Sequence, residues 1–141
     1  SELKLRRALK NSKMLSADVN AGYDPLYAEV FEKNNSAYVG KGAAISKYTG
    51  ARGKSGSNDA NAEYLGILRK AFDDAKVEYQ TAELGRIDAG GGGTIAYIPA
   101  AYGMDVIDIG VPILNMHAPY EVSSKADVYE TTKCYKAFYE M

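Results

Sequence analysis

The sequence predicts an α/β fold, a three-layer αβα arrangement around a mostly parallel sheet, and three observations lead to it. The 141 residues are 46% hydrophobic and 25% charged, the composition of one globular domain. In the second half, segments typical of strands alternate with segments typical of helices. The nearly continuous apolar run 106–111 is typical of a buried parallel strand. Asp105 and Asp108, which bracket this strand, are interpreted as strand-end and edge residues, because neither has a ligand-like partner nearby in the sequence.

The first half of the chain is predicted to contain one helix and two strands. Apolar residues at i, i+3 and i+4 predict a helix over residues 2–14. Residues 15–19 follow as a short strand that leads into a long loop punctuated by Asn, Gly and Asp-Pro. Residues 43–48 form the second predicted strand, and the Gly-, Ser- and Lys-rich segment 49–58 is predicted to be a loop.

The middle of the chain is predicted to continue with a helix, a strand and a short helix. The first of these helices covers about residues 59–75, with Asn58 as its N-cap. Its apolar stripe consists of Leu65, Leu68, Phe72 and Ala75. A strand over residues 77–81 follows, and a glycine-rich turn then leads into a short helix that ends at Ala101.

The last predicted helix starts near Ser124. Ser124 and Asp127, three residues further on, fit a capping box. The face predicted to be buried consists of Val128, Thr132, Tyr135 and Tyr139. Cys134 lies at the edge of this face and has no charged partner that would lower its pKa. We therefore predict a partly buried, structural thiol.

The charge balance excludes several classes of partner. Seventeen Lys and Arg residues face 18 Asp and Glu residues, so neither a strongly basic nucleic-acid binder nor a polybasic membrane binder is expected. No apolar run approaches the roughly 20 residues of a membrane helix, and no charged-then-apolar leader opens the chain.

The single cysteine fits a reducing compartment, so we expect a cytoplasmic protein. The start at Ser1, directly before a predicted helix, indicates a cut through a longer protein.

The four consecutive glycines Gly90–Gly93, followed by Thr94, are a candidate ligand-binding loop. A run of glycines is costly to order. It is useful where backbone must approach a ligand closely or point N–H groups at it. The run also follows the end of a predicted strand, where open α/β sheets place their sites. A flexible surface turn is the alternative interpretation.

Asp18 and His117 are the candidate metal ligands. Asp18 ends a predicted apolar strand, where an acid costs free energy unless it is paired or metal-bound. His117, the only histidine, follows the predicted buried strand in a segment made rigid by Pro112 and Pro119. A turn aspartate and an ordinary structural histidine are the alternatives. With one His and one Cys in the chain, carboxylates must supply much of any zinc site.

Three segments carry a family resemblance. They are Ser16–Pro25, with Ser-Ala-Asp-Val-Asn; Arg86–Ala96, an Arg-x-Asp segment that runs into Gly-Gly-Thr-Ile; and Met104–His117, which ends in Asn-Met-His. In this order and at this spacing they resemble the aspartyl aminopeptidase and vacuolar aminopeptidase I family of zinc metallopeptidases. The resemblance is to the C-terminal part of the catalytic domain, so residues 1–141 are expected to be that segment of an αβα zinc-peptidase domain.

The resemblance implies a dinuclear zinc aminopeptidase that releases N-terminal residues from peptide substrates. It implies that Asp18 coordinates one zinc and His117 the other. The stretch that would lie beside the substrate is Gly91, Gly92, Gly93 and Thr94. No catalytic residue is assigned in this chain, because the general base and the remaining ligands of the family belong to preceding segments. We therefore expect the isolated chain to be inactive. Family members assemble as large closed homo-oligomers, which makes a dodecamer the expected assembly.

Two alternatives to this function stay open from the sequence. The related tetrahedral, glutamyl-type aminopeptidases place a similar Met-His segment after a Gly-Gly-Thr loop, but an Asp usually follows that Thr, where this chain has Ile95. A non-catalytic assembly fragment that lacks the other ligands is the second alternative. The family's usual His shortly after the first Asp is replaced here by Gly22 and Tyr23, so acidic substrates are not assumed.

The resemblance also makes a geometric prediction. If each residue binds one metal of a dinuclear pair, the Asp18 carboxylate and the His117 ring should lie within roughly 8 Å of each other. Relaxation of the strand tips in an isolated segment extends that limit to about 10 Å.

Overall fold

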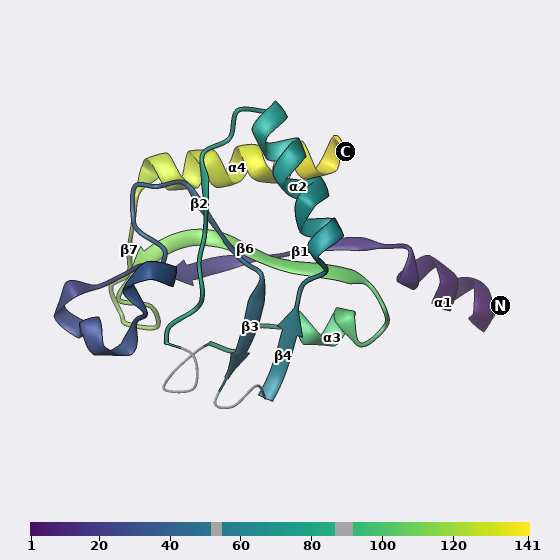
Figure 1. Ribbon diagram of the computed structural model, residues 1–141, viewed down its shortest axis with the longest axis horizontal. Helices are drawn as coiled ribbons and strands as arrows, with labels where there is room; N and C mark the ends of the chain where they lie inside the picture. Colours follow the sequence, from purple (N-terminus) through teal and green to yellow (C-terminus); the bar gives the residue numbers. More distant parts are fainter. Residues whose placement is uncertain (52–54, 87–91) are drawn as a thin grey trace.

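A five-stranded mixed sheet organises the chain (Figure 1). The computed structural model describes residues 1–51, 55–86 and 92–141. The strands run in the order β1-β6-β2-β5, and the short strand β7 pairs with β6. Their bounds are Lys13–Ala21 for β1, Ala43–Ser46 for β2, Tyr79–Thr81 for β5, Asp105–Leu114 for β6 and Val122–Ser123 for β7.

The pairing of these strands confirms the predicted α/β fold class and defines the sheet as mixed. Strand β6 runs parallel to β1 and antiparallel to β2, and β2 runs parallel to β5. The run predicted to be a buried parallel strand is the middle of β6. Because β6 has neighbours on both sides, its residues from Val106 to Gly110 are all buried.

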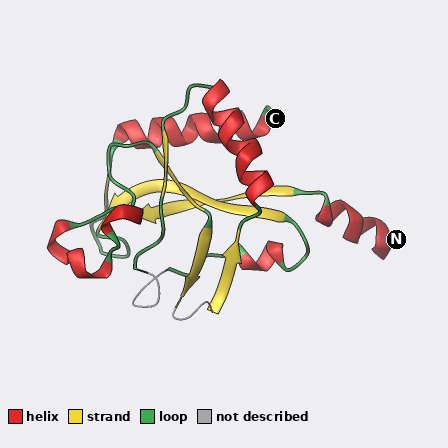
Figure 2. Ribbon diagram, in the orientation of Figure 1, coloured by secondary structure: helices red, strands yellow, loops and turns green. Residues whose placement is uncertain are grey.

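Helices and a small hairpin lie on opposite sides of the sheet, as Figures 1 and 2 show. Helices α2 (Ala62–Asp74) and α4 (Lys125–Tyr139) pack against one face. The hairpin of β3 (Tyr48–Ala51) and β4 (Ser55–Asp59), together with helix α3 (Tyr97–Ala100), lies on the other side. Helix α1 (Glu2–Lys10) extends away from the sheet at the N-terminus, and two 3-10 turns, η1 (Pro25–Val30) and η2 (Lys33–Asn35), follow β1.

The main hydrophobic core lies between the sheet and helices α2 and α4. The sheet contributes Ile45, Ile107 and Ile109, and α2 contributes Tyr64, Leu68 and Phe72. Burial of such side chains stabilises the fold by roughly 1.5–3 kcal/mol each. None of the helices in the described part of the chain is long and apolar enough to cross a membrane.

Two predicted element boundaries in the first 60 residues are wrong. The first helix ends at Lys10 instead of residue 14, because residues 13 and 14 pair with β6 and extend β1. The segment 49–58, predicted to be a loop, contains most of the β3–β4 hairpin. Its glycines suggested a loop, but Thr49 and Asn58 are cross-strand partners whose side chains hydrogen-bond to Asp108 and to the Val106 carbonyl of β6.

The two long helices exist as predicted, but one cap and one buried face differ. Asn61, and not Asn58, caps α2 by accepting from the Glu63 and Tyr64 N–H groups. Ser124 caps α4 as predicted, through the Ala126 N–H. The buried face of α4 consists of Asp127, Thr131, Cys134 and Ala137, and the predicted residues Val128, Thr132 and Tyr139 are exposed.

The buried carboxylate of Asp127 accounts for the rotated face of α4. It accepts the N–H groups of Gly40 at 2.6 Å and Gly42 at 2.8 Å. These contacts turn Asp127 inward. Thr131 and Cys134, four and seven residues later, lie on the same face of the helix and are buried with it. Apolar periodicity misses this face because its first member is charged, and a buried charge is retained only where hydrogen bonds satisfy it.

Cys134 is predicted to be unreactive in the folded protein. The side chain is fully buried, and burial raises the pKa of its thiol from 9.0 to about 12. At pH 8 we expect alkylation by iodoacetamide at least 100-fold slower in the native protein than in urea, measured by peptide mass mapping. The raised pKa also means that this thiol's contribution to stability is complete below pH 9 and is lost as pH rises towards 12.

A matched control places the thiol on the exposed face of the same helix. In a Cys134→Ala background, Thr132→Cys should react at nearly the same rate in native and unfolded protein. Equal native rates for Cys134 and for the cysteine at position 132 would contradict the buried, structural assignment.

Candidate functional site

Strand β1 has a polar face and an apolar face. Ser16, Asp18 and Asn20 alternate with Leu15, Ala17 and Val19, so the two sets point to opposite sides of the sheet. Leu15 packs against the core beneath α2 and α4. The polar set therefore faces the side of the β3–β4 hairpin.

Residues from several segments meet the polar face of β1 in one small pocket. The pocket is lined by Ser16, Asp18, Val19, Asn20, Ser46, Thr49, Leu84, Thr94, Asp108, Ile109 and Gly110. Hydroxyl, amide and carboxylate oxygens predominate among the side chains of this set. The pocket brings together Asp18, the predicted metal ligand, and Thr94, the predicted substrate-binding residue, which are 76 positions apart in the chain.

Asp108 is the buried charge of this pocket. It lies on the central strand β6, opposite Ser16 of β1 and Ser46 of β2, and is 6% exposed. Its Oδ2 atom accepts the hydroxyl of Thr49 at 3.1 Å. Burial raises the pKa of the Asp108 carboxyl, while the neighbouring hydroxyls of Ser16, Thr94 and Thr49 act in the opposite direction. The interpretation of Asp108 as an edge residue is therefore wrong.

Asn20 and Ser46 extend the polar pocket towards the end of β1. The Asn20 side-chain amide donates to the Ser46 hydroxyl at 2.7 Å, and both residues are buried. Within the parts of the chain that the structure describes, the Asn20 Oδ1 and Asp108 Oδ1 atoms are buried without a hydrogen-bond donor. Each is an acceptor with unused capacity on the polar side of the sheet.

Gly110 allows β1 and β6 to approach closely at Asp18. Asp18 and Gly110 are register partners in the parallel pair. A Cβ atom at position 110 would lie 2.4 Å from the Asp18 carbonyl oxygen and 2.7 Å from the carbonyl carbons of Asp18 and Val19. No side chain fits this space without movement of backbone, so the close approach of β1 to β6 at Asp18 requires glycine at position 110. The Asp18 side chain is exposed, and its Oδ1 accepts the Val19 N–H at 2.8 Å.

The structure describes the glycine-rich segment from Gly92 to Thr94. Gly90 and Gly91 lie outside the described residues. A Cβ atom at Gly92 would lie 1.9 Å from Leu84 Cδ2, so the backbone passes directly over that side chain. The Thr94 hydroxyl lies 3.3 Å from the Thr49 hydroxyl and accepts the Ala96 N–H at 3.2 Å. The segment that precedes α3 is thus attached to the sheet through the pocket.

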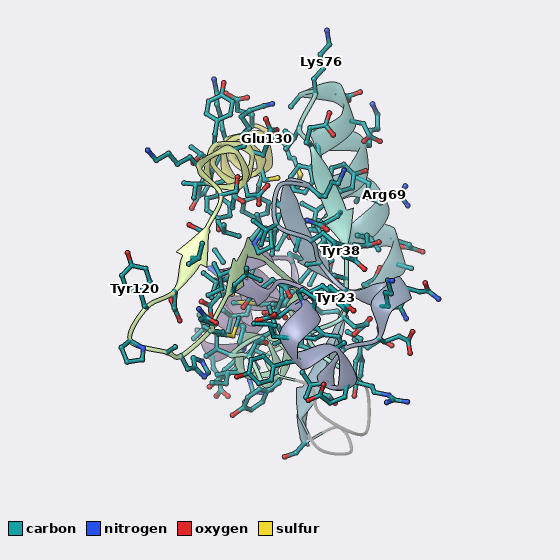
Figure 3. The ribbon with its side chains drawn as sticks, turned by 90° about the vertical axis from the view of Figure 1, so that its left-hand side faces the viewer. Tyr23, Tyr38, Arg69, Lys76, Tyr120 and Glu130 are labelled. Atoms are coloured by element: carbon teal, nitrogen blue, oxygen red, sulfur yellow. The ribbon has the colours of Figure 1, made fainter. Side chains whose placement is uncertain are left out.

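His117 lies in the connection between β6 and β7. It follows the last residue of β6, Leu114, by three positions and has a φ of 69°, in the left-handed region. Its N–H donates to the Glu121 carboxylate at 2.7 Å, which holds this conformation. The side chain is exposed, and Figure 3 shows the neighbouring Tyr120 extending outward from the same loop. His117 is not among the described residues that line the Asp18 pocket.

The residue types of Asp18 and His117 fit zinc, but their number does not complete a site. Zinc takes carboxylate oxygens and imidazole nitrogens, and a catalytic site uses three protein ligands. Over residues 1–51, 55–86 and 92–141, no three His, Cys, Asp or Glu side chains are grouped closely enough to hold a metal ion. The described residues can therefore supply part of a zinc ligand set.

Comparison with known proteins identifies the class to which this chain belongs. The family model described as aminopeptidase I zinc metalloprotease (M18) matches residues 1–139. A curated relative from Clostridium acetobutylicum, named Probable M18 family aminopeptidase 1, is 65% identical over 137 residues, which are 97% of this chain and 30% of the relative. The chain is thus a member of a class of zinc-dependent peptidases with an α/β fold. It belongs to the M18 family of aminopeptidases.

Solved structures give the same result for the fold. The crystal structure of aminopeptidase I from Clostridium acetobutylicum matches with a TM-score of 0.90 and 64% identity, over 96% of this chain and 30% of that one. The M18 enzyme of Thermotoga maritima matches with a TM-score of 0.91 and 47% identity, over 97% of this chain and 30% of that one. The S. cerevisiae mApe1 dodecamer shares the fold, with a TM-score of 0.75 and 23% identity, over 96% of this chain and 28% of that one. This chain spans about 30% of the length of curated relatives that it matches.

Sequence reasoning missed the residues that surround Asp18, although a signal for them was present. Alternation with period two through Leu15–Asn20 indicates a strand with one polar face. Asp108 shows the same pattern, since it lies between Ile107 and Ile109. Which segments cover that polar face depends on the hairpin and on the path into α3, and neither has a sequence pattern that points to this face.

Gly110→Ala is predicted to destabilise the protein by about 1–3 kcal/mol or more, because the new methyl group meets backbone atoms of Asp18 and Val19. Gly66→Ala is the matched control. Position 66 is within α2, with open space around an added Cβ, so alanine should stabilise by about 0.5–1 kcal/mol. Urea unfolding measures both. An unchanged midpoint for Gly110→Ala would mean that the close contact of β1 with β6 is not required.

Proposed function

We propose that this chain is a segment of the catalytic domain of a dinuclear zinc aminopeptidase that removes N-terminal residues from peptides. Membership of the M18 family across residues 1–139 is the observation that carries the proposal. It favours this function over the glutamyl-type relative and over a non-catalytic assembly fragment. The position of the segment in the C-terminal part of that domain is part of the proposal.

Within this function, Asp18 and His117 are proposed as ligands of one zinc ion each. Asp18 has an exposed carboxylate on the polar face of β1 and a backbone that Gly110 allows to lie close to β6. His117 has an exposed ring on a connection held by Glu121. Zinc in such a site supplies a Lewis acid for the peptide carbonyl and lowers the pKa of bound water. The other ligands and the general base would come from outside the described residues.

The segment that begins in the glycine run and ends at Thr94 is proposed to border the substrate. The backbone at Gly92 passes over the Leu84 side chain, and Thr94, two residues later, lines the same pocket as Asp18. A backbone without side chains at two successive positions can present its N–H groups to a peptide carbonyl. The role of this segment is to bind and orient the peptide beside the metal ligands, with Gly91 included by analogy.

Removal of either ligand is predicted to lower both zinc content and activity of the complete protein. Asp18→Asn and His117→Gln should each reduce bound zinc, measured by mass spectrometry of the purified protein, and reduce aminoacyl-substrate hydrolysis at least 100-fold. Asp74→Asn, which changes an exposed aspartate on α2 paired with Lys70, is the control and should retain both.

Two outcomes would overturn this assignment. One is full zinc content and activity in Asp18→Asn and His117→Gln. The other is strong metal-dependent hydrolysis by the isolated 141-residue chain, in whose described residues no three zinc-ligand side chains are grouped. A structure of the zinc-loaded complete protein tests the predicted separation, in which the Asp18 carboxylate and His117 ring lie within roughly 8 Å of each other.

A homo-oligomer, specifically a dodecamer, is the proposed assembly, and a reducing, cytoplasmic compartment is the proposed location. The dodecamer rests on the yeast relative, and the compartment rests on the single, free Cys134. Light scattering during size-exclusion chromatography of the complete protein should give a mass of 12 subunits. A monomeric mass at micromolar concentration would contradict the assembly.

A further inference from the structure

Asp108 connects three segments that are far apart in the sequence. It is on the central strand of the sheet and is 6% exposed. The Thr49 hydroxyl of β3 donates to its carboxylate at 3.1 Å, the Thr94 hydroxyl before α3 lies 3.3 Å from that of Thr49, and Ser16 of β1 lines the same pocket. A buried carboxylate costs free energy unless hydrogen bonds satisfy it. The same hydrogen bond therefore restrains the position of the donor group as well as that of Asp108.

Thr94 is the residue of this set with a direct relation to the site. It ends the Gly92–Thr94 segment, and its hydroxyl also accepts the Ala96 N–H at the entry to α3. Thr49 Oγ1 lies 3.3 Å from Thr94 Oγ1 and donates to Asp108 Oδ2 at 3.1 Å. Because Thr49 donates its one hydroxyl hydrogen to Asp108, the hydrogen between the two threonines comes from Thr94. Thr94 is therefore held to the sheet by Thr49, a hydroxyl that Asp108 orients.

Asp108 and Asp18 share one face of the sheet. Asp18 pairs with Gly110, two residues after Asp108, so the two carboxylates point to the same side on neighbouring strands. Both line the same pocket, and the charge of Asp18 contributes to raising the pKa of Asp108. By holding Thr94 from this position, Asp108 fixes the Gly92–Thr94 backbone relative to Asp18.

We propose that Asp108 is a positioning residue for substrate binding, which holds Thr94 and so the Gly92–Thr94 backbone at the distance from Asp18 that a bound peptide requires. The inference rests on the proposed function, because it needs Asp18 as a metal ligand and Gly92–Thr94 as the substrate-binding segment. Asp108 itself touches neither metal nor peptide in this role. Its loss should therefore weaken substrate binding and leave zinc in place.

The test uses steady-state kinetics and zinc analysis of the complete protein. Asp108→Asn and Thr94→Val should each raise KM for an aminoacyl substrate about 10-fold or more, with unchanged zinc content and a smaller change in kcat. Thr94→Ser, which keeps the hydroxyl, should recover affinity relative to Thr94→Val. Thr132→Val removes an exposed hydroxyl on α4 and is the matched control, with unchanged KM.

A double variant separates a shared interaction from two independent defects. Asp108→Asn combined with Thr94→Val should have nearly the KM of the more impaired single variant, because both changes interrupt the same chain of hydrogen bonds from Asp108 through Thr49 to Thr94. Effects on KM that multiply would overturn the inference, as would loss of zinc in Thr94→Val. If Asp108→Asn does not fold, the comparison of Thr94→Val with Thr94→Ser and Thr49→Val still decides it, since loss of either hydroxyl should raise KM.

Asp18→Asn distinguishes this inference from the proposed function. If Asp18→Asn loses zinc while Asp108→Asn and Thr94→Val keep the original KM, only the positioning role fails. If Asp18→Asn keeps zinc and activity, the proposed function fails and the positioning role fails with it.

Discussion

The close parallel pairing of β1 with β6 is the constraint on which the rest of the structure depends. Nine residue pairs join the two strands, from Lys13 opposite Asp105 to Ala21 opposite Ile113. Because side chains alternate in phase along both strands, this register determines that Ser16, Asp18 and Asp108 share one face. A shift by one residue would exchange the polar and apolar faces of β1. The absence of a side chain at Gly110 allows the two backbones to approach closely at Asp18.

The two faces of the sheet have different functions in this arrangement. The side covered by α2 and α4 buries a continuous apolar cluster and supplies the stabilisation that folding needs. The opposite side contains the buried polar side chains Ser16, Asn20, Ser46 and Asp108. Polar groups at such positions cost free energy unless they are hydrogen-bonded, so they persist where the apolar side offsets that cost. The predicted metal ligand Asp18 lies on the polar side.

The M18 assignment and the geometry support each other at the level of a segment. This chain contains a folded α/β unit with its own core, yet it spans only about 30% of its relatives. A catalytic zinc site needs several ligands, and residues 1–51, 55–86 and 92–141 provide no cluster of three. Asp18 on β1 and His117 in the β6–β7 connection are far apart in the sequence, so only the tertiary structure determines how they lie relative to each other.

The sequence by itself determined the α/β class, the main helices and strands, and the family. Helical and strand periodicity depend on neighbouring residues, and the motifs around Asp18, Thr94 and His117 are local. Only the tertiary structure decided the β3–β4 hairpin, the buried face of α4 and the surroundings of Asp108. The attachment of the hairpin to the sheet, the buried face of α4 and the surroundings of Asp108 depend on hydrogen bonds between residues 45 or more positions apart, such as Thr49 with Asp108 and Asp127 with Gly42. Because a buried carboxylate is stable only beside donors from other segments, its role cannot be derived from local sequence.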